Sequence, residues 1–154
     1  MKFIIALIFA YAFATICKNS IQKSPKVYYI IATCLAVITA MPLALPEPFN
    51  SFFETLFYYG SFSTALFTLV MYLNAVQNGA KFQREFMVLR GELSIIACIL
   101  ALGHNIHTGQ TYFVWLFTEP ERLTRDTALL LATLTTLVLI ALMLPLFITS
   151  FPSV

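Results

Sequence analysis

The sequence predicts an all-α protein, a polytopic bundle of about five membrane-spanning helices. Of its 154 residues, 60% are hydrophobic and 10% are charged, and the mean hydropathy is +0.86. A water-soluble domain carries roughly 25% charged residues, so most of this surface is expected to face something other than water. The apolar residues also fall into five runs separated by short polar segments, which is typical of membrane helices. We therefore expect one integral membrane domain over residues 1–154.

The five runs differ in length and in how they end. The expected helices cover residues 3–17, 27–45, 52–77, 90–107 and 127–148. The first is shorter than the roughly 20 residues that span a bilayer, and with Lys2 before it the run resembles a signal peptide. No small-x-small cleavage site precedes the polar segment KNSIQKSPK, so a retained helix is favoured. Proline lacks the N–H that continues a helix, so the second run ends at Pro42, Pro46 and Pro48.

Basic residues in the loops predict the orientation, because Lys and Arg stay on the cytoplasmic side of a membrane. They gather in the first and third loops, at Lys18, Lys23, Lys26, Lys81, Arg84 and Arg90. The fourth helix is then expected to run from inside to outside, with its histidines near the outer surface. The connector over residues 110–126 combines aromatic residues with a charged cluster, which favours a segment lying at the membrane interface.

Composition and motifs exclude several classes of function. The net charge of +2 comes without a cluster of Lys and Arg, which argues against nucleic acid as a partner. Cys17, Cys34 and Cys98 lie in or at the ends of apolar runs, so they are expected to be small buried hydrophobes. The sequence contains no paired carboxylates, nucleophile–base pair or glycine-rich phosphate loop. A transporter would need a paired intramembrane charge or broken helices in matching halves, and neither pattern is present.

The helix expected over residues 90–107 carries a stripe of small residues that ends in a histidine. At 3.6 residues per turn, one face presents Arg90, Ser94, Ala97, Ala101, His104 and Thr108. The opposite face presents Ile95, Ile99, Leu102 and Ile106, which suit lipid. Two interpretations stay open. The stripe packs closely against another helix with His104 as an interhelical hydrogen-bonding group, or it forms a groove for a flat cofactor with His104 as an axial ligand of haem iron.

His107 needs a separate interpretation, since it lies about 60° around the helix from His104. Two histidines on one turn cannot bind opposite faces of one haem iron. They could share Zn²⁺ or Cu²⁺ only with further ligands, and the sequence has no third histidine and no cysteine close by. His107 is therefore the weaker metal-ligand candidate. With Asn105 and Thr108 it is expected at the helix end, where Gly109 would be the C-cap.

The stretch RGELSIIACILALGH resembles the signature helix of the ferric-reductase-like transmembrane domain family. That family includes the haem-b membrane subunits of bacterial methionine-sulfoxide reductase systems. Its pattern of an Arg, a Leu with a small residue, an Ala and a closing haem-ligating His falls here on Arg90, Leu93, Ser94, Ala97 and His104. The ending LMLPLFITS is similar to the LPL…TS ending of the family. The resemblance covers roughly residues 50–150.

The resemblance implies an electron-transfer subunit in the bacterial cytoplasmic membrane, and any enzymatic role would be that of an oxidoreductase subunit. Electrons would pass through haem b from a cytoplasmic flavin on a partner protein, or from a quinol, to an external acceptor. Ser94, Ala97 and Ala101 would line the haem, and His104 would bind its iron. No histidine follows His107, so the second axial ligand would come from another subunit or from another side chain such as Met143.

The residues alone leave an alternative from a different class. In it the chain is a non-enzymatic integral membrane subunit or assembly partner without a cofactor. The small-residue stripe then packs against another helix within a homo- or hetero-oligomer, and His104 serves only as a hydrogen-bonding group.

Overall fold

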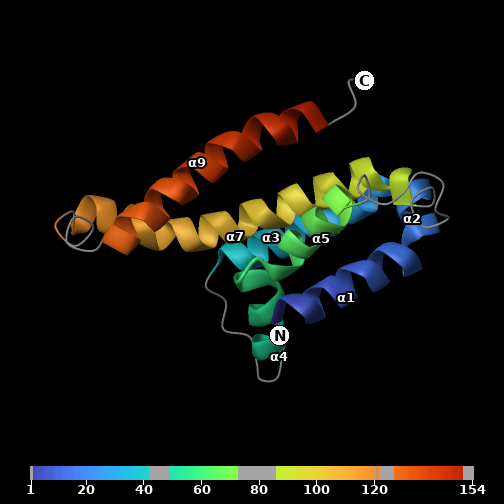
Figure 1. Ribbon diagram of the computed structural model, residues 1–154, viewed down its shortest axis with the longest axis horizontal. Helices are drawn as coiled ribbons and strands as arrows, with labels where there is room; N and C mark the ends of the chain where they lie inside the picture. Colours follow the sequence, from blue (N-terminus) through green and yellow to red (C-terminus); the bar gives the residue numbers. More distant parts are fainter. Residues whose placement is uncertain (1, 42–48, 73–85, 120, 122–126, 151–154) are drawn as a thin grey trace.

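The computed structural model describes residues 2–41, 49–72, 86–119, 121 and 127–150, and within these ranges the protein is all-α (Figure 1). For residues 49, 50, 111–113, 140 and 143–150 it describes the backbone alone. The elements are α1 (Lys2–Ile16), α2 (Lys18–Lys23), α3 (Pro25–Ala40), α4 (Phe49–Phe53), the π-helix η1 (Glu54–Tyr58), α5 (Ser61–Tyr72), α7 (Arg90–Thr118) and α9 (Thr127–Ser150).

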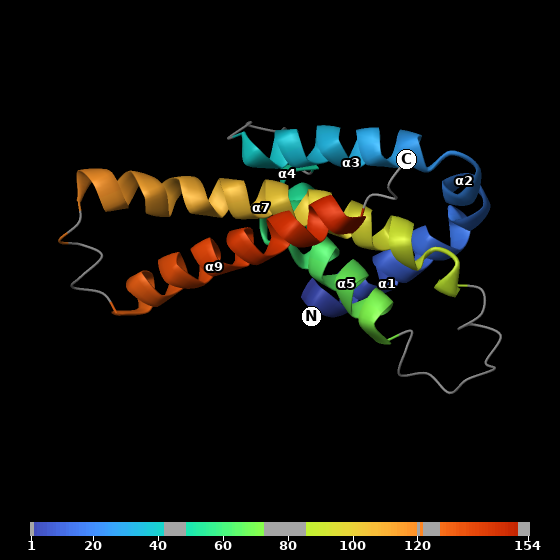
Figure 2. The ribbon, with the colours of Figure 1, turned by 90° about the horizontal axis from the view of Figure 1, so that it is seen from above.

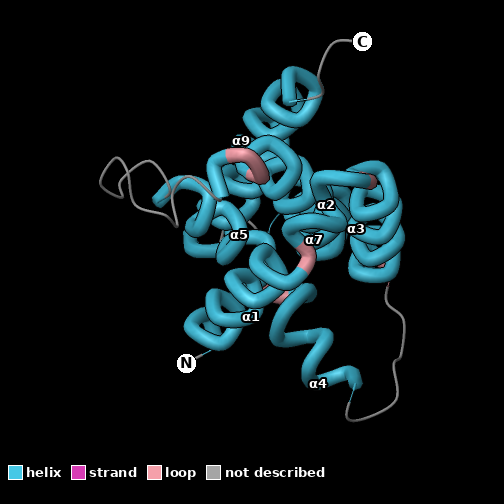
Figure 3. The backbone as a smooth tube through the Cα atoms, turned by 90° about the vertical axis from the view of Figure 1, so that its right-hand side faces the viewer, coloured by secondary structure: helices cyan, strands magenta, loops and turns pink. Residues whose placement is uncertain are grey.

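Helix α7 lies at the centre of the fold and packs against α3, α5 and α9 (Figures 1, 2 and 3). Because helices surround it, its residues from 95 to 101 are buried on every side. The expectation that Ile95 and Ile99 face lipid is therefore wrong, since they are 2% and 8% exposed. Helical periodicity could not show that both faces of α7 have protein neighbours.

In the part of the chain that the structure describes, no helix combines the length and the apolar character needed to cross a membrane. Helices α1, α3 and α5 have 15, 16 and 12 residues, fewer than the roughly 20 that the hydrocarbon core requires. Helix α7 has 29 residues, but its apolar stretch lies between Glu92 and His104. In α9, side chains are described for residues 127–139, 141 and 142. This finding overturns the predicted polytopic membrane bundle and the predicted integral location in the bacterial cytoplasmic membrane.

The helix expected over residues 52–77 is broken at Tyr59 and Gly60. Helix α4 continues into η1, and α5 begins only at Ser61. Gly60 has a φ of +63°, a conformation that costs little for glycine and much for residues with a Cβ. As a result α4 and η1 lie at an angle to α5 (Figures 1 and 3). Residues 73–77 of the expected helix lie outside the described residues.

The helix expected over residues 90–107 is longer than predicted. Helix α7 continues to Thr118, so residues 110–118 of the expected connector are helical. Gly109 is a buried residue within the helix and not its C-cap. The helix ends where Glu119 leaves the helical conformation, with a φ of −139°. Glu119 precedes Pro120, and proline disfavours the α conformation in the residue before it.

Candidate functional site

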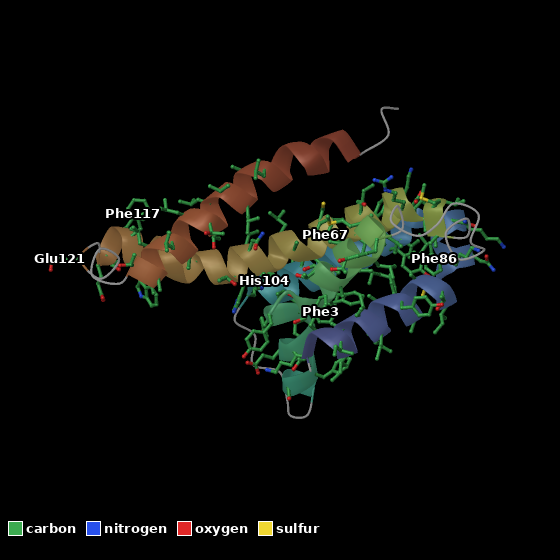
Figure 4. All side chains as sticks on the ribbon, viewed as in Figure 1. Phe3, Phe67, Phe86, His104, Phe117 and Glu121 are labelled. Atoms are coloured by element: carbon green, nitrogen blue, oxygen red, sulfur yellow. The ribbon has the colours of Figure 1, made fainter. Side chains whose placement is uncertain are left out.

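His104 is held at the break between η1 and α5. Its Nδ1–H donates a hydrogen bond of 2.5 Å to the carbonyl oxygen of Tyr58. Tyr58 is the last residue of η1, and carbonyl groups in the last turn of a helix lack intrahelical donors. The side chain therefore caps the end of the π-helix from α7, and Figure 4 shows His104 between the two elements.

Gly60 allows the imidazole of His104 to lie directly against the backbone. A Cβ built on Gly60 would be 2.7 Å from Cδ2 and 2.9 Å from Cγ of His104. The carbonyl oxygen of Gly60 accepts hydrogen bonds from the hydroxyls of Ser63 and Thr64, each at 2.9 Å. Side chains thus donate hydrogen bonds to the backbone on both sides of the break. His104 does so at the end of η1, and the two hydroxyls do so at the start of α5.

His107 contacts the same tyrosine in a different way. The rings of His107 and Tyr58 lie 4.8 Å apart between centroids, with 37° between their planes. The Nδ1 of His107 is buried and has no hydrogen-bond partner within the described ranges. His104 therefore binds the backbone of Tyr58 while His107 packs on its ring. His107 does not lie at a helix end as expected, because α7 continues to Thr118.

The surroundings of His104 favour the neutral imidazole. Burial lowers the pKa of His104, the hydrogen bond to the Tyr58 carbonyl partly opposes this, and the neighbouring His107 lowers the pKa further. A neutral imidazole that donates from Nδ1 carries no proton on Nε2. The ring therefore acts here as a neutral hydrogen-bond donor to the backbone.

We expect acid to destabilise the protein through His104. The pKa of His104 is lower in the folded state than the ordinary value of about 6.5, so the unfolded chain binds more protons below that pH. The free energy of unfolding should therefore fall as the pH drops from about 7.5 to about 5.5, and the contribution is fully present above the unfolded pKa. Urea unfolding at both pH values measures it. In His104→Gln the free energy of unfolding should fall less between these two pH values than it does in the wild type. An equal fall would show that His104 is not its cause.

Small residues around His104 serve close helix packing. Ala97 and Ala101 are buried beneath neighbouring helices. A Cβ built on Gly103 would lie 2.7 Å from both the Cα and the carbonyl oxygen of Ala36, so α7 and α3 meet there backbone to backbone. A haem face needs an open flat slot beside its ligand, and protein atoms fill this one. As they are arranged, Ala97, Ala101 and His104 therefore leave no open slot for haem.

Within the ranges that the structure describes, no group of three or more His, Cys, Asp or Glu side chains could hold a metal ion. The general prediction of a metal-binding chain is therefore wrong for these ranges, whereas the roles of His104 and His107 as metal ligands stay untested predictions. A metal ion needs several converging ligands, and only these two come together here. The side chain of Met143 lies outside the described residues. Haem b, a flavin-bearing or quinone partner and electron transfer stay predictions from the sequence.

The sequence did not predict the residues that contact His104. Tyr58 lies 46 positions away, and nothing in the helical pattern connects the two. Two glycines were available as signals. Gly60 interrupts an otherwise continuous apolar run, and Gly103 directly precedes His104. A glycine within an expected helix often has a packing reason. Gly60 leaves room for the His104 ring, and Gly103 lets the backbones of α7 and α3 meet.

No family model matches the chain, and no solved structure matches it. A relative in Treponema pallidum (strain Nichols), described as an uncharacterized protein, is 34% identical over 155 residues. The match covers 98% of this chain and 42% of the relative. The chain thus spans less than half the length of that protein. The resemblance of residues 90–104 to the ferric-reductase-like family stays a prediction.

Proposed function

We propose that this chain is a non-enzymatic helical assembly subunit whose outer faces are covered by other polypeptides. The observation that carries the proposal is the apolar surface of α1, α3 and α9, in which the charged residues are Lys2 and Lys26 alone. Large hydrophobic side chains at least 48% exposed on these helices are Ile4, Ile5, Ile8, Ile16, Val27, Ile30, Ile31, Val37, Leu131, Leu134, Val138 and Leu142. Large exposed apolar patches mark interaction surfaces.

The total surface supports the same conclusion. The chain exposes 9878 Å², whereas a compact monomer of 17.3 kDa exposes about 7,800 Å². The excess of about 2,000 Å² on one chain is larger than the roughly 600–1,000 Å² that each partner hides in a standard interface, so it would suffice for more than one contact. An assembled state would bring the exposed surface of the chain into the ordinary range.

The arrangement of the histidines also favours assembly over catalysis. His104 acts as a hydrogen-bond donor that joins α7 to η1, and Gly103 serves contact between α7 and α3. These are roles in packing. Glu54 also lies near the break, and its carboxylate accepts a hydrogen bond from the Tyr59 hydroxyl at 3.1 Å. Tyr59 is exposed, and its ring lies 4.4 Å from the Lys2 ammonium, so this cluster belongs to the surface.

The proposal predicts that charges on the outer face of α1 prevent assembly without unfolding the chain. Ile4 and Ile8 are 61% and 64% exposed, so Ile4→Lys/Ile8→Lys should fold normally. Burying two unpaired ammonium groups in an interface is costly, and association should weaken by at least about tenfold, or 1.4 kcal/mol. The tagged chain is purified from cells that make it naturally, and light scattering gives the mass of its complex.

A matched control adds the same charges elsewhere. Asn19 and Gln22 are exposed polar residues of α2, and Asn19→Lys/Gln22→Lys should leave the complex intact. A wild-type chain that is a monomer of 17.3 kDa would contradict the proposal. A reduced-minus-oxidised haem spectrum that disappears in His104→Ala would contradict it as well and would support the electron-transfer alternative.

A further inference from the structure

The segment formed by α4 and η1, called here the α4–η1 arm (residues 49–58), is only partly enclosed by the rest of the fold. Of the side chains described over residues 51–58, Leu56 alone is buried. Helix α4 packs mainly against η1 and lies at the edge of the molecule (Figures 1 and 3). A segment with few buried contacts opens at a lower free energy than the whole fold does. The arm is therefore the kind of segment that opens while the other helices stay folded.

The backbone between Tyr58 and Gly60 is suited to act as a hinge for the arm. The carbonyl oxygen of Gly60 is fixed in α5, because it accepts the amide hydrogen of Thr64 at 3.0 Å. The carbonyl oxygen of Tyr58, two residues earlier, accepts its hydrogen bond from His104 of α7. Gly60 has a φ of +63° and no Cβ, so its backbone dihedrals have a wide allowed range. The two carbonyl groups thus separate a fixed α5 from an arm that can turn.

Tyr58 makes contacts that join the arm to α7. Its carbonyl oxygen accepts the hydrogen bond from Nδ1 of His104, and its ring lies 4.8 Å from the ring of His107 between centroids. Both contacts act directly before the hinge, where the arm would begin to turn. Leu56 is 1% exposed, so turning the arm also brings one large apolar side chain into water, which favours the closed state.

We propose that the α4–η1 arm is a lid that turns about Gly60 and uncovers His104 and His107 on α7. With the lid closed, the carbonyl oxygen of Tyr58 binds one imidazole and its ring packs on the other. With the lid open, Nδ1 of His104 loses this acceptor and the ring of His107 is uncovered on one side. The two imidazoles can then exchange hydrogen bonds with another molecule. Such a molecule holds the lid open, because binding shifts an equilibrium toward the state of higher affinity.

Thiol labelling of Leu56→Cys measures the opening, because a buried thiol reacts only when it is uncovered. Leu93→Cys is the matched control, since Leu93 is 0% exposed but lies in α7. The thiol at position 56 should react at least about tenfold faster than the thiol at position 93. Its rate should change little with urea below the unfolding transition, because local opening exposes little surface. Mass spectrometry separates both sites from Cys17, Cys34 and Cys98.

Two further substitutions, each combined with both reporters, separate the opening of the lid from global unfolding. His104→Ala removes the hydrogen bond to the arm and should speed labelling at position 56 by at least about threefold. Val70→Ala makes a cavity in α5, where Val70 is 6% exposed, and it should speed labelling at position 93 by at least about fivefold. Labelling at position 56 should then stay within about twofold of its rate without Val70→Ala, because local opening does not require α5 to unfold.

Three outcomes would overturn the lid. They are equal urea dependence of labelling at positions 56 and 93, an equal effect of Val70→Ala on both positions, and a rate at position 56 that His104→Ala leaves unchanged. Circular dichroism confirms that each variant keeps its helices. If Leu56→Cys does not fold, Phe57→Cys is the second reporter, since Phe57 is a partly buried residue of the arm. These outcomes do not bear on the proposed assembly function, which the α1 experiment tests separately.

Discussion

Replacing Gly60 with alanine is expected to lower the free energy of unfolding by about 2–5 kcal/mol. Two costs combine in this estimate. At a φ of +63°, a residue with a Cβ is less stable than glycine by roughly 1–2 kcal/mol. The new methyl group would also lie 2.7 Å from Cδ2 of His104, and overpacking of this kind costs about 1–3 kcal/mol. The imidazole would have to move, and its hydrogen bond to Tyr58 would weaken.

Urea unfolding measures this effect, and Gly91→Ala is the matched control. A Cβ at Gly91 has no atom within 4 Å, and the residue is exposed in the first turn of α7. That substitution should be neutral or stabilise the chain by up to about 1 kcal/mol through helix propensity. The double variant Gly60→Ala/His104→Ala should lose less stability than the two single losses added together, since the clash needs both side chains. Simple additivity would show that the ring does not lie against Gly60.

Helix positions could be predicted from the sequence wherever polar residues flank an apolar run. The first helix was expected over residues 3–17 and is observed over Lys2–Ile16, because Lys2 and the KNSIQK segment flank it. The break at Gly60 could not be found in this way, since apolar residues continue on both sides of it. The continuation of α7 through Gly109 was missed because one glycine is tolerated in a helix, and the helix ends only at Thr118.

The surroundings of the helices were harder to predict than the helices themselves. Low charge and high hydropathy predicted that apolar faces would be exposed to something other than water, and the exposed Ile4, Ile8 and Leu142 agree with this part of the reasoning. The step from there to membrane-spanning helices was wrong. Composition indicates how much apolar surface a chain has. Whether lipid or protein covers that surface depends on the length of the helices and on the partners present. Ile95 and Ile99 show the same limit, because their neighbours are other helices.

For the candidate site, the sequence predicted that His104 lies inward and that His107 has a separate role. The structure places His104 against η1 and His107 against the ring of Tyr58. Of the two interpretations left open, the described contacts of His104 are those of an interhelical hydrogen-bonding group. The acceptor was beyond prediction because its position depends on the turn at Gly60.

Removing the polar ring atoms of His104 and of His107 should have opposite effects on the free energy of unfolding. His104→Ala leaves the Tyr58 carbonyl without its donor, which costs about 1–3 kcal/mol, and it leaves a cavity beside Gly60 with a further cost of about 1–2 kcal/mol. The free energy of unfolding should therefore fall by about 2–5 kcal/mol. His104→Asn keeps an N–H donor near the position of Nδ1 and should restore part of this loss. Urea unfolding and amide hydrogen exchange across η1 measure both effects.

His107→Phe should leave the chain as stable as the wild type, or more stable by up to about 2 kcal/mol. Phenylalanine keeps the aromatic contact with Tyr58 and removes a buried Nδ1 that has no partner in the described part of the protein, and leaving such an atom unpaired costs about 1–3 kcal/mol. If the two imidazoles acted together on one ligand, both substitutions would lower stability in its presence and neither would raise it. A large loss in His107→Phe would thus show that Nδ1 has a partner, and it would reopen the question of what the second histidine binds.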